Sequence, residues 1–263
     1  MSRLIETAAA QVDESTSPIG FETPGGATPK WHRYLTINGD HAYEIGNVCN
    51  TCAFFFERKA GAVEGLDVGE LAEALETGLR SLDRTLTSRL AEMLPAGSYE
   101  TLLLRSVIRA VKLGEPGDYF VDEQMQNWGL DGFWGLPHSP RVPYYRAGVR
   151  RMPKSALLFE FVIPMYPRNW LNADRVQHYR RLFDEGREPT AVAVSVLDIK
   201  QPADSRVAHW CLAHYVLDGH HKLEAASLSG RPMTLISFLA TTQGVSSSEE
   251  IRQAIAELAV DEG

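Results

Sequence analysis

The residues most suited to chemistry lie near the C-terminal end, in the segment Asp218-Gly219-His220-His221-Lys222 between a strand-like run and a helix-like run. Free N–H groups and the helix dipole make the start of a helix a natural site for anions. Gly219 permits a sharp turn and lets a ligand approach the backbone. His221 and Lys222 are then expected to donate charge-assisted hydrogen bonds to phosphate oxygens, and Asp218 to hold a metal ion or accept a substrate proton. The alternative is a simple turn followed by solvated histidines.

A second candidate is the pair Cys49 and Cys52, because C-x-x-C spacing allows two thiolates to bind one tetrahedral Zn²⁺ ion. A structural zinc site needs two further ligands. Candidates are His32, His41, His209 and Cys211. The simpler interpretation is that both cysteines are small buried residues beside the phenylalanines at 54–56. Burial of both cysteines is therefore preferred, and zinc binding at Cys49 and Cys52 is the alternative. A redox pair is disfavoured because the cysteines do not lie at the start of a helix.

Two further features concern ligand access. Residues 127–135 are rich in Trp and Gly, and they could form a lid over a ligand or pack between two parts of the chain. Glu160 alternates with Phe159 and Phe161 in a strand-like run, which favours a solvent-facing carboxylate over one in a site.

The composition limits the class of protein. Of the 263 residues, 44% are hydrophobic and 23% charged, as in an ordinary soluble globular protein. The formal net charge of −8 argues against nucleic acid as a partner. Three cysteines are too few for a disulfide framework, and we expect a cytoplasmic location. No apolar run reaches the ~18 residues of a membrane span, and no secretory signal is visible. We therefore expect no membrane partner, a small-molecule substrate and the option of a homo-oligomer.

The elements before residue 150 are predicted from local patterns. Residues 1–30 are rich in small and polar residues and are expected to form a mobile tail. Asn38-Gly39 between strand-like runs predicts a hairpin over 31–45. Leucines at three- and four-residue steps predict one helix over 67–93. Residues 101–113 are strand-like, and 114–143 are expected to form a long irregular loop.

The remainder of the chain has a clearer pattern. Strands are expected at 156–165, 191–199, 208–217 and 233–240, with helices at 174–184 and 221–228 and a capped helix after 246. The fold class is therefore α+β. The expected parts are a tail (1–30), an N-terminal α/β extension (31–150) and a C-terminal domain (151–263).

Residues 156–256 resemble the ParB/sulfiredoxin superfamily in the order of their elements and in four short runs. These are FVIPM at 161–165, GREPT at 186–190, VLDG at 216–219 followed by HHKLEAA, and GRPM at 230–233. The helix start after VLDG is the most specific, because that superfamily binds nucleotide phosphates there. The resemblance implies ATP or another nucleoside triphosphate with Mg²⁺ near residues 218–222.

Departures from the superfamily pattern separate its branches. His220 occupies the position of the reactive cysteine of sulfiredoxins, so sulfinic-acid repair is disfavoured. No helix-turn-helix follows, in contrast to chromosome-segregation ParB proteins. The free-serine-kinase branch matches best at Asp218-Gly219-His220, although the glutamate that this branch carries after its first strand is missing from 165–170. Arg168 lies where sulfiredoxins keep an arginine.

The resemblance implies a nucleotide-dependent phosphotransferase that acts on a small hydroxylated molecule such as an amino acid. Asp218 would bind Mg²⁺ or act as a base, and His220 and Arg168 would complete the catalytic group. Phosphates would bind at Gly219, His220, His221 and Lys222. The alternatives are a non-catalytic nucleotide-binding switch and a ParB-like nuclease.

Overall fold

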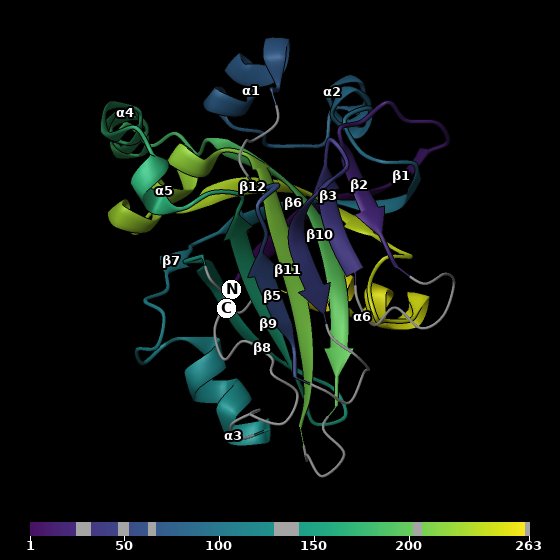
Figure 1. Cartoon of the computed structure of the whole chain (residues 1–263). Coiled ribbons are helices and arrows are strands. Elements are labelled where there is room, and N and C mark those ends of the chain that lie inside the picture. Colours follow the sequence, from purple (N-terminus) through teal and green to yellow (C-terminus); the bar gives the residue numbers. More distant parts are fainter. Residues whose placement is uncertain (25–32, 47–52, 63–66, 129–141, 202–206, 261–263) are drawn as a thin grey trace.

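The computed structural model describes residues 1–24, 33–46, 53–62, 67–128, 142–201 and 207–260. Strands form an eight-stranded sheet and a four-stranded sheet, and helices cover the larger sheet (Figure 1). The chain therefore has the expected α+β class. In spatial order the large sheet contains β1 (Arg3–Val12), β6 (Gly97–Ser106), β12 (Met233–Ala240), β10 (Thr190–Lys200), β11 (Ala208–Asp218), β9 (Ala156–Pro164), β8 (Tyr145–Met152) and β7 (Arg109–Ala110).

The smaller sheet is an antiparallel meander at the N-terminal side of the chain. Its order is β2 (Ile19–Glu22), β3 (Arg33–Ile37), β4 (Asp40–Gly46) and β5 (Phe55–Arg58). The helices are α1 (Ala72–Thr77), α2 (Arg84–Ala91), α3 (Met125–Trp128), α4 (Ala173–Asp184), α5 (His220–Ser229) and α6 (Ser248–Leu258). None of the described helices is long and apolar enough to cross a membrane.

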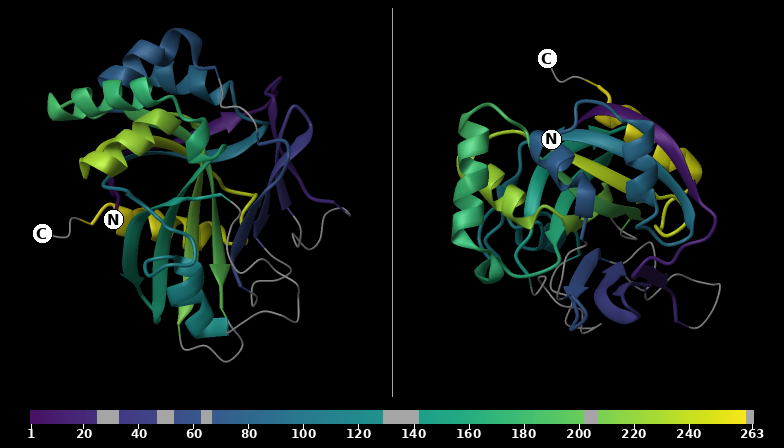
Figure 2. Two further views of the ribbon diagram at one scale, coloured as in Figure 1. Left: turned by 60° about the vertical axis from the view of Figure 1, so that its left-hand side comes forward. Right: turned by 90° about the horizontal axis from the view of Figure 1, so that it is seen from above.

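The central strands β10 and β11 are buried along nearly their whole length, because both faces of the sheet are covered. One face packs against α4, α5 and α6 through Tyr179, Leu223 and Ile251. The opposite face packs against the small sheet and against α1 and α2, with Leu35 and Leu90 in the contact. The two views in Figure 2 show these layers. The site described below lies at the edge of the helical layer, where strand ends meet helix starts.

The C-terminal elements confirm the predicted alternation of strand, helix, strand, strand, helix and strand. β9 pairs parallel to β11, β10 pairs antiparallel to β11, and β12 returns parallel to β10. Local caps explain the helix starts: Asn172 accepts the N–H of Arg175 at 3.0 Å, and Ser247 forms a capping box with Glu250. Each parallel pairing requires a crossover, and α4 and α5 lie on these crossovers.

The expected mobile tail is wrong for residues 3–12 and 19–22. β1 pairs with β6 from Arg3 to Val12, and β2 is an edge strand of the small sheet. A largely exposed edge strand needs few large apolar residues. The small and polar composition of residues 1–30 therefore predicted a mobile tail where the chain forms strands. β1, β6 and β8 also share one sheet with β9–β12, and the expected division near residue 150 falls inside β8.

The hairpin expected over 31–45 is confirmed in the described residues from 33 onward, with Asn38 and Gly39 at positive φ angles of 52° and 83°. The single helix expected over 67–93 is wrong, because the chain breaks between α1 and α2. Gly78 has a φ of 97°, and a Cβ there would lie 2.2 Å from the carbonyl oxygen of Glu188. Asp83 then caps α2 by accepting the N–H of Leu86 at 2.8 Å.

The expected strand at 101–113 corresponds to β6 and the short β7. The region 114–143 is not wholly irregular, because a π-helical turn (Phe120–Gln124) and α3 follow one another there. Most of the expected lid, from residue 129 onward, lies outside the described residues.

The solvent-facing interpretation of Glu160 is wrong, since its side chain is 0% exposed. Its carboxylate accepts hydrogen bonds from the backbone N–H and the hydroxyl of Ser2, and it lies 3.3 Å from Nε2 of His214. His214 also contacts Ser195 at 2.6 Å through Nδ1. These groups form a polar network inside the sheet–helix core. Burial opposes ionisation of Glu160, but the hydrogen bonds and the nearby His214 lower its pKa overall.

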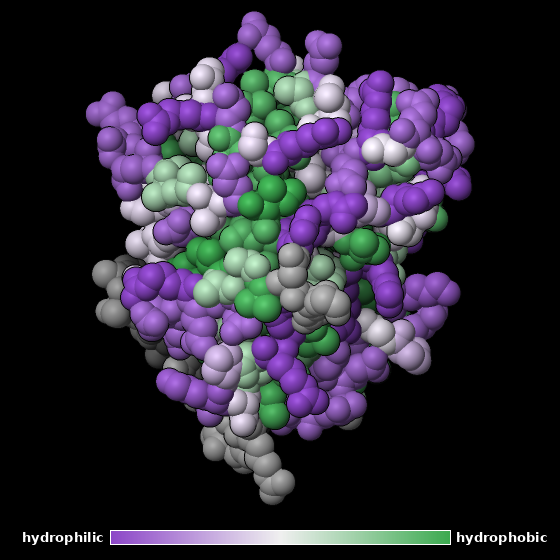
Figure 3. Space-filling model, turned by 180° about the vertical axis from the view of Figure 1, so that it is seen from behind, coloured by the Kyte–Doolittle hydropathy of each residue, from purple (hydrophilic) through white to green (hydrophobic). Residues whose placement is uncertain are grey.

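Apolar exposure does not by itself point to a site. Seen from behind, hydrophobic side chains gather in a central band between hydrophilic ones (Figure 3). The exposed large hydrophobic side chains come from several elements: Ile5, Val107, Val149, Trp170, Leu228 and Val260. Single exposed apolar residues are ordinary on protein surfaces.

Candidate functional site

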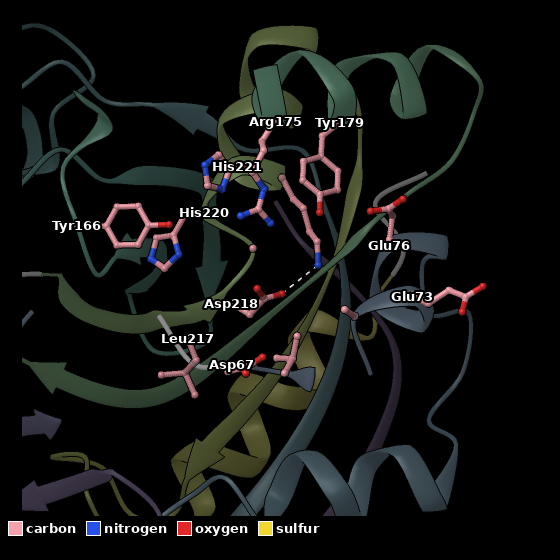
Figure 4. Close-up of a pocket in the computed structure, with 14 residues that line it drawn as sticks. Asp67, Glu73, Glu76, Tyr166, Arg175, Tyr179, Leu217, Asp218, His220 and His221 are labelled. Atoms are coloured by element: carbon pink, nitrogen blue, oxygen red, sulfur yellow. Dashed lines mark hydrogen bonds and ion pairs between the residues drawn. The ribbon is translucent and has the colours of Figure 1, made fainter. Parts of the chain in front are cut away.

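A pocket of about 550 Å³ lies where β11 ends and α5 begins, facing α4 and the segment that carries α1 (Figure 4). The predicted motif thus opens onto a real cavity. Its polar lining is Asp67, Glu73, Glu76, Tyr166, Arg175, Tyr179, Asp218, His220, His221 and Lys222, and Gly219 also lines it.

Gly219 determines how α5 starts. Its φ of 104° is left-handed, and a Cβ there would lie 2.7 Å from Cβ and 2.9 Å from Cα of Ala191 on β10. Glycine is therefore required both by the backbone angle and by the close packing of the turn on the sheet. Helix geometry leaves the N–H groups of the first turn without acceptors inside the helix, and this turn borders the pocket.

Lys222 has a different role from the expected one. Its side chain is only 4% exposed, and Nζ donates to the carbonyl oxygen of Thr190 at 2.9 Å and to Oδ2 of Asp218 at 3.0 Å. The ammonium therefore joins the end of β11 to the start of β10. Asp218 keeps a side-chain exposure of 24% and remains accessible from the pocket. We conclude that Lys222 orients Asp218 before any ligand binds.

The two histidines act as hydrogen-bond acceptors from backbone N–H groups. Nε2 of His220 accepts from Met165 at 2.9 Å, and Nε2 of His221 accepts from Asn172 at 3.1 Å. Burial lowers the pKa of His220 to about 3. Burial, followed by the positive charge of Arg175, also lowers the pKa of His221. Both rings are therefore neutral near neutral pH, and each carries its proton on Nδ1. Neither is the cation that the sequence suggested.

Arg168 is not part of the described lining of this pocket. Its guanidinium forms an ion pair with Glu224, whose other oxygen accepts the hydroxyl hydrogen of Tyr145 at 2.8 Å. The hydrogen bond to Glu224 raises the pKa of Arg168, against a smaller opposing effect of burial. The structure therefore does not bring Arg168 together with Asp218.

Sequence reasoning missed several lining residues. Arg175 and Tyr179 lie on α4 and point toward the start of α5, as Figure 4 shows. Tyr166 follows β9, and its ring stacks on His220 with centroids 3.9 Å apart. Glu73 and Glu76 come from α1, more than a hundred residues away in sequence. Arg175 could have been suspected from its place in the first turn of a predicted helix, whereas nothing local linked α1 to residue 218.

The charge of the pocket differs from that of a plain phosphate site. With both histidines neutral, its described lining has a formal charge of −2, from four carboxylates and two cations: Asp67, Glu73, Glu76 and Asp218, with Arg175 and Lys222. One of the two cations is already paired with Asp218. Arg175 and the helix start can attract an anion, while the α1 carboxylates can attract a cationic group.

The expected metals fit the described residues to different degrees. Those residues contain no cluster of three or more His, Cys, Asp or Glu side chains arranged to hold a metal ion. Asp218 can supply one carboxylate to Mg²⁺, which commonly completes its ligands with substrate phosphates and water. Cys49 and Cys52 lie outside the described residues. Cys211 is buried with its sulfur 3.7 Å from the hydroxyl of Tyr119, and burial raises the pKa of its thiol.

No family model, curated protein or solved structure matches the chain. The resemblance to the ParB/sulfiredoxin superfamily therefore stays a prediction that rests on the short runs around residues 161–233.

Proposed function

We propose that the pocket binds a nucleoside triphosphate and that the protein transfers a phosphoryl group to a small hydroxylated molecule such as an amino acid. The observation that carries this proposal is the opening of the first turn of α5 into a cavity beside Arg175. Backbone N–H groups at a helix start and one guanidinium are a suitable combination for phosphate oxygens. In this proposal Arg175 takes the role expected of Arg168.

Asp218 is the candidate magnesium ligand or base. Lys222 fixes one of its oxygens, and the carboxylate stays partly exposed. Mg²⁺, when bound with a nucleotide, would neutralise phosphate charge that the acidic lining would otherwise repel. The requirement is physical: a triphosphate entering a pocket with a formal charge of −2 needs a counter-cation.

The remaining lining residues fit the positioning of the two substrates. Tyr166 lines the pocket with its ring stacked on His220 and, at a centroid distance of 6.1 Å, on Trp170, and an aromatic side chain held in this way suits contact with a nucleobase. His220 itself contributes orientation, because its Nε2 is occupied by the N–H of Met165. Glu73 and Glu76 lie on the opposite side, where an ammonium group of the acceptor would be favoured.

The proposal predicts that Arg175→Ala weakens nucleotide binding by about tenfold or more, since hydrogen bonds to charged groups contribute about 1.5–3 kcal/mol. Arg181→Ala is the matched control, because Arg181 is an exposed arginine on the same helix that is absent from the described pocket lining. Calorimetry with ATP, CTP and ADP, with and without Mg²⁺, measures both variants.

Phosphoryl transfer is tested separately by incubating the protein with ATP, Mg²⁺ and pools of hydroxylated amino acids. Formation of a phosphorylated amino acid would support the proposed phosphotransferase activity. Binding without any transfer favours the non-catalytic switch. Equal nucleotide affinities of the Arg175→Ala and Arg181→Ala variants would refute the proposal that phosphate binds beside Arg175.

A further inference from the structure

β1 forms one edge of the large sheet and has β6 as its sole partner among the described strands. It runs for ten residues, and the five from Ile5 to Ala9 are all exposed. In the right-hand view of Figure 2 it follows the outer margin of the molecule. An edge strand presents a row of backbone N–H and C=O groups that another strand can pair with.

From Thr7 to Val12 this edge lacks the charges, proline and bulges that usually protect edge strands. Residues 7–12 contain neither a charged side chain nor proline. Ala8, Ala9 and Ala10 leave the backbone uncovered by large side chains. A bulge does interrupt the register, but it lies at the start of the strand, between Leu4 and Glu6. Proteins normally blunt a long edge with charges, proline or bulges, so the unprotected stretch from Thr7 to Val12 suggests a surface that is used.

Grooves flank β1 on both faces of the sheet. The larger, about 1100 Å³, lies between β1 and α2, and a smaller one of about 460 Å³ lies between β1 and α6. The position of α2 is fixed at both ends: Leu82 donates its N–H to Glu6 at 2.7 Å, and Ser17 donates to the carbonyl oxygen of Met93 at 2.5 Å. A strand added beside β1 would therefore lie between two helices, with space for side chains on both faces.

The charge of the larger groove indicates which kind of strand fits. It is lined by four carboxylates and one cation: Glu6, Asp13, Glu14 and Glu92, with Arg84. A segment with lysine or arginine would meet complementary charge. A second copy of β1 would not, because it would bring its own Glu6, Asp13 and Glu14 against the same carboxylates.

We propose that the β1 edge accepts an extended, basic segment of a partner protein as an additional strand of the large sheet. Main-chain hydrogen bonds to β1 supply the pairing, and the carboxylates beside α2 select lysine and arginine. This surface is separate from the pocket at Asp218, so the proposal stands independently of the phosphotransferase assignment.

The test uses the full chain and a fluorescent peptide of about ten residues, the length of β1, in which lysine alternates with valine. Fluorescence anisotropy measures the affinity, and hydrogen–deuterium exchange locates the contact. We expect binding, slower exchange of the amides of residues 5–12, and at least a tenfold weaker affinity for a peptide with glutamate in place of lysine.

Two protein variants separate charge selection from general effects. Glu14→Lys combined with Glu92→Lys should weaken lysine-peptide binding by at least about tenfold. Asp184→Lys, an exposed reversal at the end of α4, should leave it unchanged. Three results would each overturn the proposal. They are no binding, binding without slower amide exchange in β1, and equal affinity for the lysine and glutamate peptides. A concentration-dependent dimer that protects the same amides would also overturn it, because a second copy would then occupy the edge.

Discussion

Replacing Gly219 by alanine tests how the site is built, and the chain supplies its own control at the other end of α5. At Gly219 the φ of 104° alone costs about 1–2 kcal/mol for a residue with a Cβ. The new Cβ would also lie 2.7 Å from Cβ and 2.9 Å from Cα of Ala191, in a buried strand that cannot move freely. Overpacking of this kind adds about 1–3 kcal/mol.

Gly230→Ala carries the cost of the left-handed backbone angle without the cost of overpacking. Gly230 ends α5 at a φ of 60°, and a Cβ there would meet nothing within 4 Å. The loss of unfolded-chain entropy on replacing glycine is similar at both positions and cancels in the comparison. The free energy of unfolding should therefore fall by about 1–3 kcal/mol more in Gly219→Ala than in Gly230→Ala.

Urea unfolding of the two variants, followed by circular dichroism, measures the difference. The m-value should stay the same if the change acts on the native packing alone. Equal losses in the two variants would refute the inference that the turn is packed against β10. A normal free energy of unfolding for Gly219→Ala would refute the left-handed helix start as well.

Two further predictions concern groups beside the pocket. Thr190→Val should lower the free energy of unfolding by about 1–3 kcal/mol, because the Thr190 hydroxyl accepts the partly buried N–H of Leu79 at 2.8 Å. A variant as stable as the parent in urea would contradict this. The pKa of His220, about 3 in the folded protein, lies below the 6.5 of an unperturbed histidine. The unfolded chain therefore takes up a proton first, and stability should fall as the pH drops from 6.5 toward 3. His220→Gln should remove up to about 1.4 kcal/mol of this loss per pH unit, measured by urea titrations across that range. An unchanged pH dependence would show that folding does not lower the pKa of His220.

The elements that could be predicted from the sequence depend on short-range signals. Asn38-Gly39 specifies a two-residue hairpin turn, and the structure has both residues at positive φ. Asn172 and the Ser247–Glu250 pair mark helix starts through their own side chains. In each case the residues that decide the conformation lie within a few positions of one another.

The features that were missed depend on contacts between distant segments. β1 is a strand because β6 pairs with it, and nothing within residues 3–12 requires this. The leucine pattern over 67–93 predicted one helix, but the chain leaves the helix at Gly78, where a φ of 97° and the nearby carbonyl of Glu188 both disfavour a side chain. Glu160 looked solvent-facing because its buried partners, Ser2 and His214, lie far away in sequence.

For the candidate site, sequence located the turn but gave the wrong chemistry for its side chains. Lys222 and the two histidines were expected to face a ligand as cations. Burial makes both rings neutral, and Lys222 is held by Asp218 and Thr190. The position of these residues at the start of a helix could not show which hydrogen-bond partners each side chain would have in the folded protein.

Three parts of the pocket share one fixed point, the segment that enters β10 at residues 188–191. Gly78 fits against the carbonyl of Glu188, and the N–H of Leu79 is held by Thr190, so this segment positions α1 and its carboxylates. Lys222 donates to the carbonyl of Thr190, which positions Asp218. The turn at Gly219 rests on Ala191, which positions the start of α5.

This convergence explains why a sequence with its acidic and cationic residues so far apart can form one pocket. The entry to β10 lies next to β12 in the sheet, where Thr190 pairs with Thr234, and its backbone is therefore held by the core. Displacing it would move the α1 carboxylates, Asp218 and the helix start together. The α1 carboxylates and the start of α5 are thus held at fixed separations by the sheet, which suits a ligand carrying both a cationic and an anionic group.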